Sequence, residues 1–420
     1  LRALGRLDDA EASYRKAIVL KPDYAEAHLN LCEILEKTND IDTLLIALED
    51  AMNKTHTMKA DFLYYTALVA YRKERYAEAD TVVTQITEDE VSKRRKAPYY
   101  KLVGDLRHRN QDYDAAFFAY KNSNQAVKAE LEYQRLERVA DCYFEVQRNT
   151  ARKLTELSMG SPYPKRLSSN VRRPTFLVGF PRSGTTLLDT ILRTHSKMNV
   201  VEEQPMLAEM DSALGDLQDV SDIEVIDEND LSVARNAYLE ELAKHADWTG
   251  GSLVIDKLPL NLLRAPLIHR AFPEAKFILA LRHPFDCIMS CWMQTFKLNT
   301  AMANMVDLDR IVDFYCVAMD IFHLSQKRYE LDVHRIRYED LIEDFEAETT
   351  SLLKFLGLEW EPSLDNYQAT AVARRTIYTP SYSQVIKPIY KTGAYRWKYY
   401  EKYLDKYKSQ LAPWFEKFGY

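Results

Sequence analysis

Residues 176–192 read FLVGFPRSGTTLLDTIL, in which an apolar run, a short turn and a helical pattern follow one another. A strand, a glycine-containing turn and a helix start are typical of loops whose backbone N–H groups hold a phosphate. The loops of nucleoside triphosphatases follow the pattern G-x-x-x-x-G-K-[ST]. Here the spacing from Gly179 to Gly184 fits that pattern, but Thr185 occupies the position of the lysine. The loop is therefore predicted to hold phosphate by other means.

The side chains that replace the lysine are one guanidinium and three hydroxyls, those of Arg182, Ser183, Thr185 and Thr186. Such a set suits a phosphate held by hydrogen bonds and a guanidinium without a metal ion. The acidic strand end that would hold magnesium in a nucleoside triphosphatase has no convincing counterpart, because Asp256 is followed directly by a lysine. This set predicts nucleotide binding for a reaction other than transfer of a terminal phosphoryl group.

Three segments, in order along the chain, resemble one family. PRSGTT after an apolar strand resembles the 5′-phosphosulfate loop of sulfotransferases that use 3′-phosphoadenosine-5′-phosphosulfate (PAPS). KFILALRHPFDCIMS resembles their 3′-phosphate segment, in which a strand ends in arginine, here Arg282, and a serine follows eight residues later, here Ser290. The run S-x-x-Q-V-I-K-P from Ser381 to Pro388 resembles the nucleotide-covering segment of the protein-tyrosine sulfotransferase branch. The resemblance covers residues 172–400, and it makes that branch the nearest one.

The resemblance implies which residues hold the nucleotide. Arg282 could instead form a surface salt bridge, and Tyr338 could pack in the core rather than contact the nucleotide. Gln294 stands where the tyrosine-sulfating relatives carry a basic residue, so one 3′-phosphate contact differs. The implied set is Arg182, Ser183, Gly184, Thr185 and Thr186 at the 5′ end, Arg282 and Ser290 at the 3′ end, and Tyr338, Ser381, Gln384, Lys387 and either Arg396 or Lys391 around the adenosine.

Two adjacent glutamates in NVVEEQPMLAEM are the candidates for the base that takes a proton from an acceptor hydroxyl. By resemblance the second, Glu203, takes this role, in a site that we expect to be partly desolvated. Glu202 could serve instead, or the pair could be a solvated helix start. The family has a glycine before the pair, where this chain has Val201. His195 corresponds in type to the base of the cytosolic branch, although its place at a helix end favours a cap or a core contact.

Lys257 in VIDKLPLN is the candidate for stabilising the charge that develops on the leaving phosphate, with Arg182 as its partner in catalysis. The lysine follows a short apolar run, at the position where a parallel sheet presents ligand-facing groups. A solvated loop lysine is the alternative. Asp256 could orient Lys257, although adjacent residues on a strand point to opposite faces.

The elements that must position these residues alternate after residue 174. Short apolar runs such as TFLVGF, GSLVIDK and KFILALR are separated by helical segments, which predicts βαβ units and a parallel sheet. DVHRIRYEDL (332–341) could add another strand, with Tyr338 near its end. The fold class that we expect is α/β, a P-loop-like sulfotransferase domain of three layers over residues 174–420. The tail from residue 394 is helix-like and rich in tyrosine, tryptophan and lysine.

The first third of the chain carries a repeat instead. Stretches that start at Gly5, Asn39, Glu74 and Gln111 share a turn-like start and the same spacing of apolar and small residues, at intervals of 34, 35 and 37 residues. They resemble the second helices of tetratricopeptide repeats over residues 1–145. An ordinary helical bundle is the alternative. The predicted domains are an all-α solenoid over 1–150, a linker over 151–173 and the sulfotransferase domain, with a peptide or protein partner on the solenoid.

Composition limits the function classes. The net charge of −7 argues against a general nucleic-acid binder, and no apolar run reaches the length of a membrane span. Five scattered cysteines suggest a reducing compartment, hence a cytoplasmic protein, and the pair Cys287 and Cys291 favours buried packing over zinc binding. Because the chain opens with Leu1 inside a repeat, we expect its true N-terminus to lie upstream. A homodimer is a further expectation.

The sequence thus predicts a sulfotransferase that moves a sulfuryl group from PAPS to an acceptor hydroxyl, leaves 3′-phosphoadenosine 5′-phosphate (PAP) and requires no metal. The acceptor could be a protein tyrosine, a glycan or a small molecule, and the glutamate pair and the Q-V-I-K-P run favour the tyrosine. A catalytically inert repeat scaffold is the alternative from another class. A kinase-type phosphoryl transferase is disfavoured because the loop lysine is missing.

Overall fold

The computed structural model describes residues 7–159, 173–215, 220–246, 252–373 and 393–420 of the chain. It divides into two compact units, Leu1–Gln134 and Arg135–Tyr420. The first unit is all helical, and the second is built around a parallel sheet.

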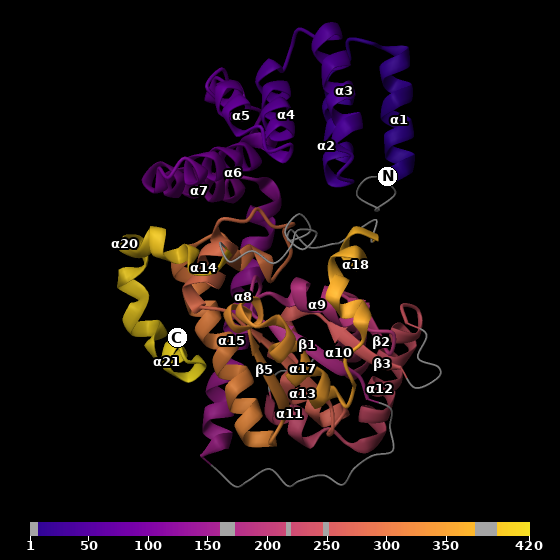
Figure 1. The fold of residues 1–420 in the computed structure, drawn as a ribbon. Helices are drawn as coiled ribbons and strands as arrows, with labels where there is room; N and C mark the ends of the chain where they lie inside the picture. Colours follow the sequence, from indigo (N-terminus) through magenta and orange to yellow (C-terminus); the bar gives the residue numbers. More distant parts are fainter. Residues whose placement is uncertain (1–6, 160–172, 216–219, 247–251, 374–392) are drawn as a thin grey trace. The chain divides into compact units, whose positions relative to one another are not determined.

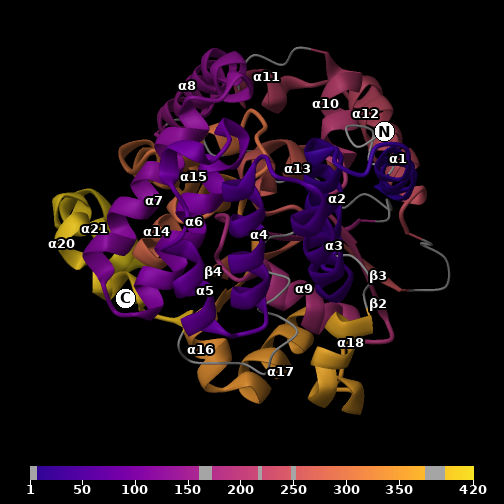
Figure 2. The same cartoon turned by 90° about the horizontal axis from the view of Figure 1, so that it is seen from above.

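The first unit is a row of antiparallel helices joined by short turns (Figures 1 and 2). The four repeated stretches of the sequence become α1, α3, α5 and α7, and α2, α4 and α6 alternate with them, which confirms the predicted repeat. The helices are α1 (Leu7–Leu20), α2 (Ala25–Lys37), α3 (Ile41–Lys54), α4 (Lys59–Arg72), α5 (Tyr76–Val83), α6 (Lys93–Arg109) and α7 (Tyr113–Lys128), with a 3₁₀ turn η2 (Glu88–Glu90) before α6.

The same turn recurs between the helices of each pair. Asn39, Glu74 and Gln111, the residues at which the sequence repeat starts, all have left-handed backbones with φ of 57°, 61° and 63°. In two of the three turns the next residue caps the following helix, since the side chains of Asp40 and Asp112 each accept a backbone N–H three residues on. The sequence period therefore corresponds to a repeated backbone geometry.

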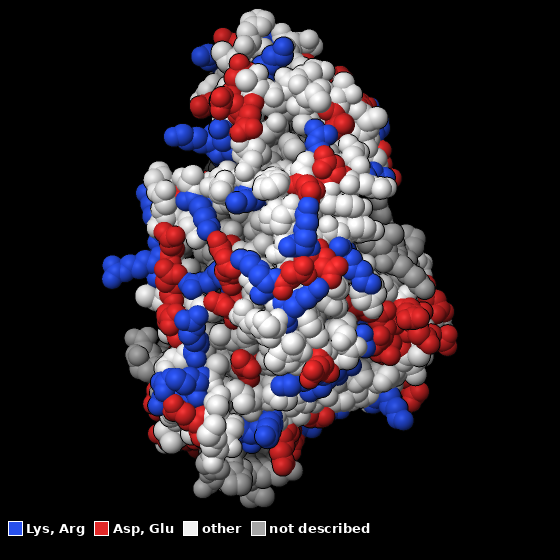
Figure 3. Space-filling model, turned by 90° about the vertical axis from the view of Figure 1, so that its left-hand side faces the viewer, with Lys and Arg blue, Asp and Glu red and all other residues white. Residues whose placement is uncertain are grey.

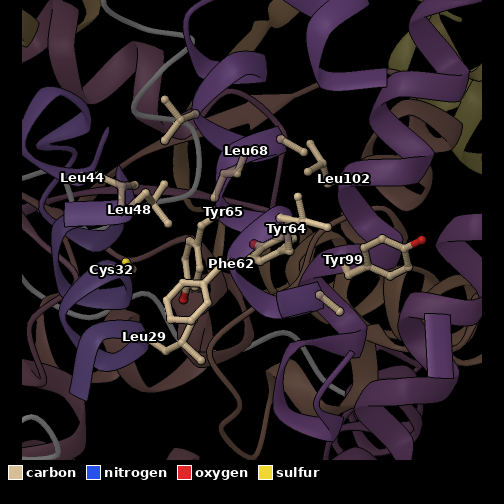
Figure 4. Close-up of a cluster of buried hydrophobic side chains, with 14 of the residues drawn as sticks. Leu29, Cys32, Leu44, Leu48, Phe62, Tyr64, Tyr65, Leu68, Tyr99 and Leu102 are labelled. Atoms are coloured by element: carbon tan, nitrogen blue, oxygen red, sulfur yellow. The ribbon is translucent and has the colours of Figure 1, made fainter. Parts of the chain in front are cut away.

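The core of the first unit runs continuously through successive helices (Figure 4). Leu29 and Cys32 of α2, Leu44 and Leu48 of α3 and Phe62 of α4 are each at most 2% exposed. Burial raises the pKa of the Cys32 thiol to about 12. Each helix packs mainly against the next helix along the chain, as expected of a solenoid.

Helix α8 (Leu131–Ser158) differs from the predicted linker, which was to begin at residue 151. In the second unit the helix buries Phe144 and Leu154, both 0% exposed, and Phe144 contacts Phe314 with ring centroids 5.8 Å apart. The polar residues after 151 occupy the outer face of an amphipathic helix, and a run of polar residues is also typical of a linker. The predicted boundary at 150 therefore lies inside a helix of the second unit.

The sheet of the second unit has five parallel strands in the order β2-β3-β1-β4-β5. The four strand runs singled out in the sequence, including the one at 332–341, are confirmed, and the strand before the glutamate pair was not predicted. The central strand is buried along its whole length, as its uninterrupted apolar run requires. The strands are β1 (Thr175–Gly179), β2 (Met198–Glu202), β3 (Leu253–Lys257), β4 (Lys276–Leu281) and β5 (Asp332–Arg337).

Helices cover both faces of the sheet, which gives the predicted three layers (Figure 1). On one face, Leu177 and Ile278 pack against α9 (Thr185–Thr194), α17 (Phe345–Leu356) and α18 (Tyr367–Ala373). On the other face, Phe176 and Phe277 contact aromatic residues of α12 (Glu228–Ala243), α15 (Leu308–Tyr329) and the end of α13 (Ala265–Ala271).

The remaining elements connect the layers. They are α10 (Met206–Leu214), α11 (Val220–Val225), η3 (Pro259–Arg264), α14 (Pro284–Trp292), η4 (Met302–Met305), α16 (Tyr338–Glu343), η5 (Pro362–Asn366), η7 (Arg396–Tyr400), α20 (Glu401–Leu404), η8 (Asp405–Tyr407) and α21 (Lys408–Phe418).

Acidic and basic side chains are interspersed on the face of the molecule shown in Figure 3. Ion pairs of the second unit include Lys406–Asp309, at 2.8 Å, and Lys408–Glu401, at 2.7 Å. All five cysteines are free thiols. None of the helices in the described ranges is long and apolar enough to cross a bilayer.

Candidate functional site

The candidate residues converge on one edge of the sheet, where all five parallel strands have their carboxyl ends. The phosphate-type loop follows β1, Glu203 follows β2, and Lys257 is the last residue of β3. Arg282 follows β4, and Tyr338 follows β5. In open parallel sheets this edge is where ligands bind.

The loop after β1 is closely packed at its two glycines. A Cβ on Gly179 would lie 2.5 Å from Ser183 Oγ and 2.7 Å from the carbonyl oxygen of Ala280. Gly184 has φ of 103° and is the N-cap of α9. The first position therefore has no room for a side chain, and the second needs a backbone that other residues rarely adopt. The pattern G-x-x-x-x-G reflects both requirements.

Ser183 gives the loop an unsatisfied polar atom. Its residue is 2% exposed, and its buried hydroxyl oxygen has no hydrogen-bond partner among the described residues. The hydroxyl belongs to the turn that leads into α9, whose first backbone N–H groups have no acceptor within the helix. A buried hydroxyl without a partner costs free energy, and an anion bound in the loop would supply the acceptor.

The fold brings Arg182 next to Arg282 and Ser290, which lie 100 and 108 residues further along the chain. Arg182 has a left-handed backbone, with φ of 71°, and its Nε donates to Ser290 Oγ at 3.0 Å. Arg282 Nη1 donates to the carbonyl oxygen of Arg182 at 3.2 Å. The predicted 5′ and 3′ phosphate segments are thus adjacent.

The phosphate-type loop, Arg282 and Ser290 together form an anion cradle. Tyr338 and Arg282 form its side next to β5. The Arg282 guanidinium lies 4.9 Å from the ring centroid of Tyr338, a cation–π distance. A Cβ on Gly184 would come within 3.1 Å of the same ring. Arg282 Nε is buried and makes no hydrogen bond within the described ranges. Arg282 is not a surface salt-bridge residue, because its side chain is only 13% exposed.

Lys257 and the glutamate pair form a compact ion cluster. Lys257 is 0% exposed, and its Nζ donates to Glu202 Oε1 at 3.0 Å and to Glu203 Oε1 at 2.9 Å. Glu202 is paired in register with Lys257 across β2 and β3, so their side chains share a face. The alternative of a solvated loop lysine is wrong, and so is that of a solvated helix start, since Glu202 ends a strand and is 7% exposed.

The backbone of Glu203 explains how two adjacent carboxylates reach one ammonium group. In a regular strand successive side chains point to opposite faces. Glu203 instead has φ of 52°, in the left-handed region, and its backbone N–H donates to the carbonyl oxygen of Lys257 at 2.8 Å. This turn directs the second carboxylate back to the same lysine. The residue before the pair, Val201, lies within β2 and needs no glycine.

Asp256 lies on the opposite face of β3 from Lys257 and does not orient it. Its carboxylate accepts the hydroxyl of Tyr238 at 2.8 Å and an N–H of Asn261 at 3.2 Å. Burial raises the pKa of Asp256 to about 7, although the hydrogen bond from Tyr238 acts in the other direction. The alternation of side chains along β3 is the reason why the expected orienting contact is absent between these two described residues.

His195 holds a turn at the far end of α9 from the loop, as its sequence position favoured. Its Nε2 lies 3.0 Å from the carbonyl oxygen of Glu359, and its Nδ1 accepts the backbone N–H of Lys197 at 3.1 Å. The residue is 2% exposed. Both ring nitrogens are engaged in holding the chain, so His195 is not placed to act as a base.

Some predicted nucleotide residues cannot be compared with the structure. Ser381, Gln384, Lys387 and Lys391 lie outside the described residues. Arg396 is described and begins η7. Gln294 Nε2 points to the carbonyl oxygen of its neighbour Thr295, at 3.4 Å.

The sequence reasoning did not identify Asp286, a buried carboxylate of α14 that lies beside Arg282. The available signal was an acidic residue four positions after the arginine, inside an otherwise apolar helix start. Such a residue needs partners when it is buried. Its partners come from η7, more than one hundred residues away, and no local pattern points to them.

Two family models match parts of the chain. Residues 174–362 match the model of the sulfotransferase family, and residues 1–39 match a TPR repeat model. The first match spans all five strands, the phosphate-type loop, the ion cluster and Arg282. The second covers α1 and α2.

The chain is also similar to individual proteins and solved structures. An uncharacterized protein of Aquifex aeolicus is 27% identical over 91% of this chain and 49% of its own length. Protein-tyrosine sulfotransferase 2 of Gallus gallus is 27% identical over 53% of this chain and 62% of its own. This chain therefore spans about half the length of the curated relatives it matches. Among solved structures, the sulfotransferase domain of the Synechococcus PCC 7002 olefin synthase covers 57% of this chain and 91% of its own, with 22% identity and a TM-score of 0.38.

Proposed function

We propose that this chain, whose residues 174–362 form a sulfotransferase-family domain, transfers a sulfuryl group from PAPS to an acceptor hydroxyl. The observation that carries the proposal is the arrangement of the ion cluster. A buried ammonium group with two carboxylates within 3.0 Å stands at the sheet edge where the phosphate-type loop also opens. A base and a cation beside an anion cradle are what sulfuryl transfer to a hydroxyl requires.

The cradle fits a nucleotide with phosphate groups at both its 5′ and 3′ positions. The unpartnered hydroxyl of Ser183 and the start of α9 suit the 5′ group. Arg282, with a buried Nε that has no hydrogen-bond partner in the described ranges, and Ser290 suit the 3′ group. Arg182 bridges the two through its contacts with Ser290 and Arg282. PAPS would supply the activated sulfuryl group.

The nucleotide-binding set that we propose is the one that the resemblance implied. It comprises Arg182, Ser183, Gly184, Thr185, Thr186, Arg282, Ser290, Tyr338 and Arg396, together with Ser381, Gln384 and Lys387 outside the described residues.

Glu203 is the proposed base. Its side chain is 30% exposed, whereas that of Glu202 is 6% exposed, so only Glu203 is readily reached by an acceptor molecule. In the reaction the acceptor oxygen forms a bond to sulfur, the bond between sulfur and the phosphate oxygen breaks, and Glu203 takes the acceptor's proton. Glu202 holds Lys257 from the enclosed side.

Lys257 is proposed to stabilise the charge that develops on the leaving phosphate. It is an ammonium group already removed from water, so its attraction for that oxygen is stronger than on the surface, and little reorganisation is needed when charge develops. Arg182 supports the same charge from the loop.

For the acceptor we propose a peptide tyrosine. Support comes from the glutamate pair and the Q-V-I-K-P run, and from the similarity to the chicken protein named as a protein-tyrosine sulfotransferase. A glycan or small-molecule hydroxyl is the second candidate. Incubation with labelled PAPS and a tyrosine peptide, beside a panel of glycans, decides between them, and label on a sugar alone would contradict the tyrosine.

The repeat unit is proposed to hold a peptide or protein partner, since stacked helical repeats expose an extended surface for such partners. The further proposals are a cytoplasmic location, no nucleic-acid partner and a homodimer. Cell fractionation tests the location, a nucleic-acid binding assay tests the absence of that partner, and light scattering measures the mass in solution and so tests the homodimer.

The basic test of the function is binding of PAP, the desulfated nucleotide. We expect PAP to raise the melting temperature of the chain without added metal, because a ligand that binds only the folded state stabilises it. No shift at millimolar PAP would favour an inert repeat scaffold. Magnesium-dependent ATP hydrolysis would favour a phosphoryl transferase instead.

A further inference from the structure

A buried carboxylate outside the proposed nucleotide and catalytic sets joins two distant parts of the second unit. Asp286 lies in the first turn of α14, and its side chain is 1% exposed. One of its oxygens accepts the backbone N–H of Tyr395 at 2.6 Å, and the other accepts that of Trp397 at 2.9 Å. Tyr395, the N-cap of η7, has a left-handed backbone with φ of 59°. The carboxylate therefore holds an unusual turn by two charge-assisted bonds.

The same carboxylate lies beside the arginine proposed to hold the 3′-phosphate. Asp286 Oδ2 is 3.9 Å from Arg282 Nε, the buried atom that makes no hydrogen bond in the described ranges. Arg282 Nη1 donates to the carbonyl oxygen of Arg182, and its Nη2 donates to that of Gly393. A guanidinium has five N–H groups, so donors remain for a ligand while two carbonyls fix its plane.

Packing around His283 connects the two anchors. Its ring stacks on that of Trp397, with centroids 4.6 Å apart and planes 15° apart, and its backbone N–H donates to Glu339 Oε1 at 2.9 Å. Trp397 is thus held by two contacts: its backbone N–H donates to Asp286, and its indole ring stacks on the ring of His283. These contacts hold residues 393–397 next to the carboxyl end of β4, which Arg282 directly follows.

We propose that Asp286 is a positioning residue that orients Arg282 toward the 3′-phosphate of the nucleotide. It supplies the negative charge that faces Arg282 Nε, and it anchors the turn whose Gly393 carbonyl accepts from Arg282 Nη2. Loss of this charge would release both the Arg282 side chain and the turn that carries the Gly393 carbonyl, so the orientation of the guanidinium would no longer be fixed. The inference rests on the proposed function, because it presupposes that a 3′-phosphorylated nucleotide binds here.

The test compares two nucleotides that differ only in the 3′-phosphate, PAP and adenosine 5′-monophosphate. Their dissociation constants are measured by calorimetry for the full chain and for Asp286→Asn, Arg282→Ala and the double variant. The matched control is Asp227→Asn, because Asp227 also accepts two backbone N–H groups at a helix start, at 2.8 and 3.0 Å, but caps α12.

Asp286→Asn is expected to reduce the preference for PAP over adenosine 5′-monophosphate about tenfold, the scale of a lost charge-assisted contact. Asp227→Asn should leave the preference unchanged. Arg282→Ala should abolish the preference, and adding Asp286→Asn to it should change little more, because the two residues act through one contact.

Two results with Asp286→Asn would contradict the inference. Equal weakening of both nucleotides by Asp286→Asn would mean a general structural role and would overturn the inference. So would an unchanged preference. If the unaltered chain shows no preference for PAP, the proposed function itself fails, which the measurements on that chain alone reveal.

A second measurement decides the matter if Asp286→Asn does not fold. Hydrogen exchange of the unaltered chain reports directly on the backbone N–H groups of Tyr395 and Trp397. Both should exchange slowly, and PAP should slow them further, because ordering Arg282 orders the turn that it contacts. Exchange of these two amides that does not respond to saturating PAP would overturn the inference.

Discussion

At the scale of single residues, the proposed chemistry depends on how one buried ammonium group is shared. Lys257 has no exposed surface, and a charge in that position needs partners of opposite sign. Glu202 provides one from within the sheet, and the left-handed backbone of Glu203 provides the other from the loop. The two carboxylates of the cluster therefore differ in access: the Glu202 side chain is enclosed, whereas the Glu203 side chain is partly exposed.

Replacement of the proposed base should affect turnover and not binding. For Glu203→Gln we expect a fall in kcat by about two to four orders of magnitude, the usual contribution of a general base. The affinity for PAP should hardly change. The measurements are sulfuryl transfer with saturating PAPS and PAP calorimetry, with Glu209→Gln on α10 as an exposed control of the same residue type. Near-normal turnover would show that Glu203 is not the base.

Removal of the buried cation should destabilise the fold as well as stop the reaction. Lys257→Met leaves Glu202 buried without its counter-charge, a loss of about 3–5 kcal/mol in the free energy of unfolding. The double variant Lys257→Met with Glu202→Gln removes both charges and should recover part of that stability, although not the activity. Urea unfolding of both variants tests this, and equal stability of the two would contradict the coupling.

Asp256 makes a prediction about pH. Its folded-state pKa of about 7 lies above its ordinary value, so the folded state holds the proton more tightly than the unfolded state. Its contribution is therefore full below about pH 4 and is lost as the pH rises through 7. Relative to the unaltered chain, Asp256→Asn should gain at most about 3 kcal/mol between pH 5 and pH 8. Melting curves of both proteins across this range measure the difference, and a constant difference would contradict the assignment.

At the scale of elements, the loop between β1 and α9 depends on backbone packing. Its two glycines are needed for different reasons. Gly179 has no room for a Cβ, whereas Gly184 has a positive φ that residues with a side chain rarely adopt. The cradle is therefore a property of the junction between strand and helix. Arg182, in the middle of the turn, is also in the left-handed region. Strain of this kind is retained where the surrounding structure holds it.

Gly179→Ala tests the close packing of the loop. The added Cβ would meet Ser183 Oγ and the backbone of Ala280 at less than 3 Å, so we expect a loss of about 1–3 kcal/mol in stability and of most PAP affinity. Gly357→Ala is the matched control, since Gly357 has φ of 76° but no neighbour within 4 Å of its Cβ position. The control should lose about 1 kcal/mol and keep full nucleotide affinity. Similar affinities in the two variants would argue against the packing explanation.

At the scale of the whole molecule, the boundary between the first and the second unit decides which pieces of the chain can fold. The second unit begins at Arg135, within α8, and not after residue 150. Phe144 of this helix fills the core beside Phe314, and Arg310 lies over the same ring at 4.1 Å. The part of α8 from Arg135 onward, which includes Phe144, therefore belongs with the second unit.

Two truncations test this boundary. A chain of residues 135–420 should fold and bind PAP, whereas a chain of residues 151–420 exposes the surface that Phe144 covers. Loss of one large core side chain alone costs about 3–5 kcal/mol, a large fraction of a typical domain's stability. Circular dichroism melting and PAP calorimetry compare the two chains. A stable 151–420 chain would instead support the boundary drawn from the sequence.

The local features of this protein could be predicted from short stretches of its sequence. The apolar runs predicted four of the five strands, the spacing of Gly179 and Gly184 predicted the loop, and the interval between turn-like starts predicted the helical repeat. Each of these depends on residues within one turn or one strand, where neighbours along the chain set the backbone. The part of α8 after residue 151 was missed because its polar outer face resembles a linker when its partner helix is unknown.

Which of these features come into contact depends on the packing of the whole second unit. The strand order β2-β3-β1-β4-β5 places Glu202 and Lys257 in register, and a single left-handed residue turns Glu203 to the same ammonium group. The contact of Asp286 with Tyr395 and Trp397 joins positions 109 and 111 residues apart. Such meetings depend on the order and register of the strands and on the free energy of burying charges in pairs, and neither is encoded in a short stretch of sequence.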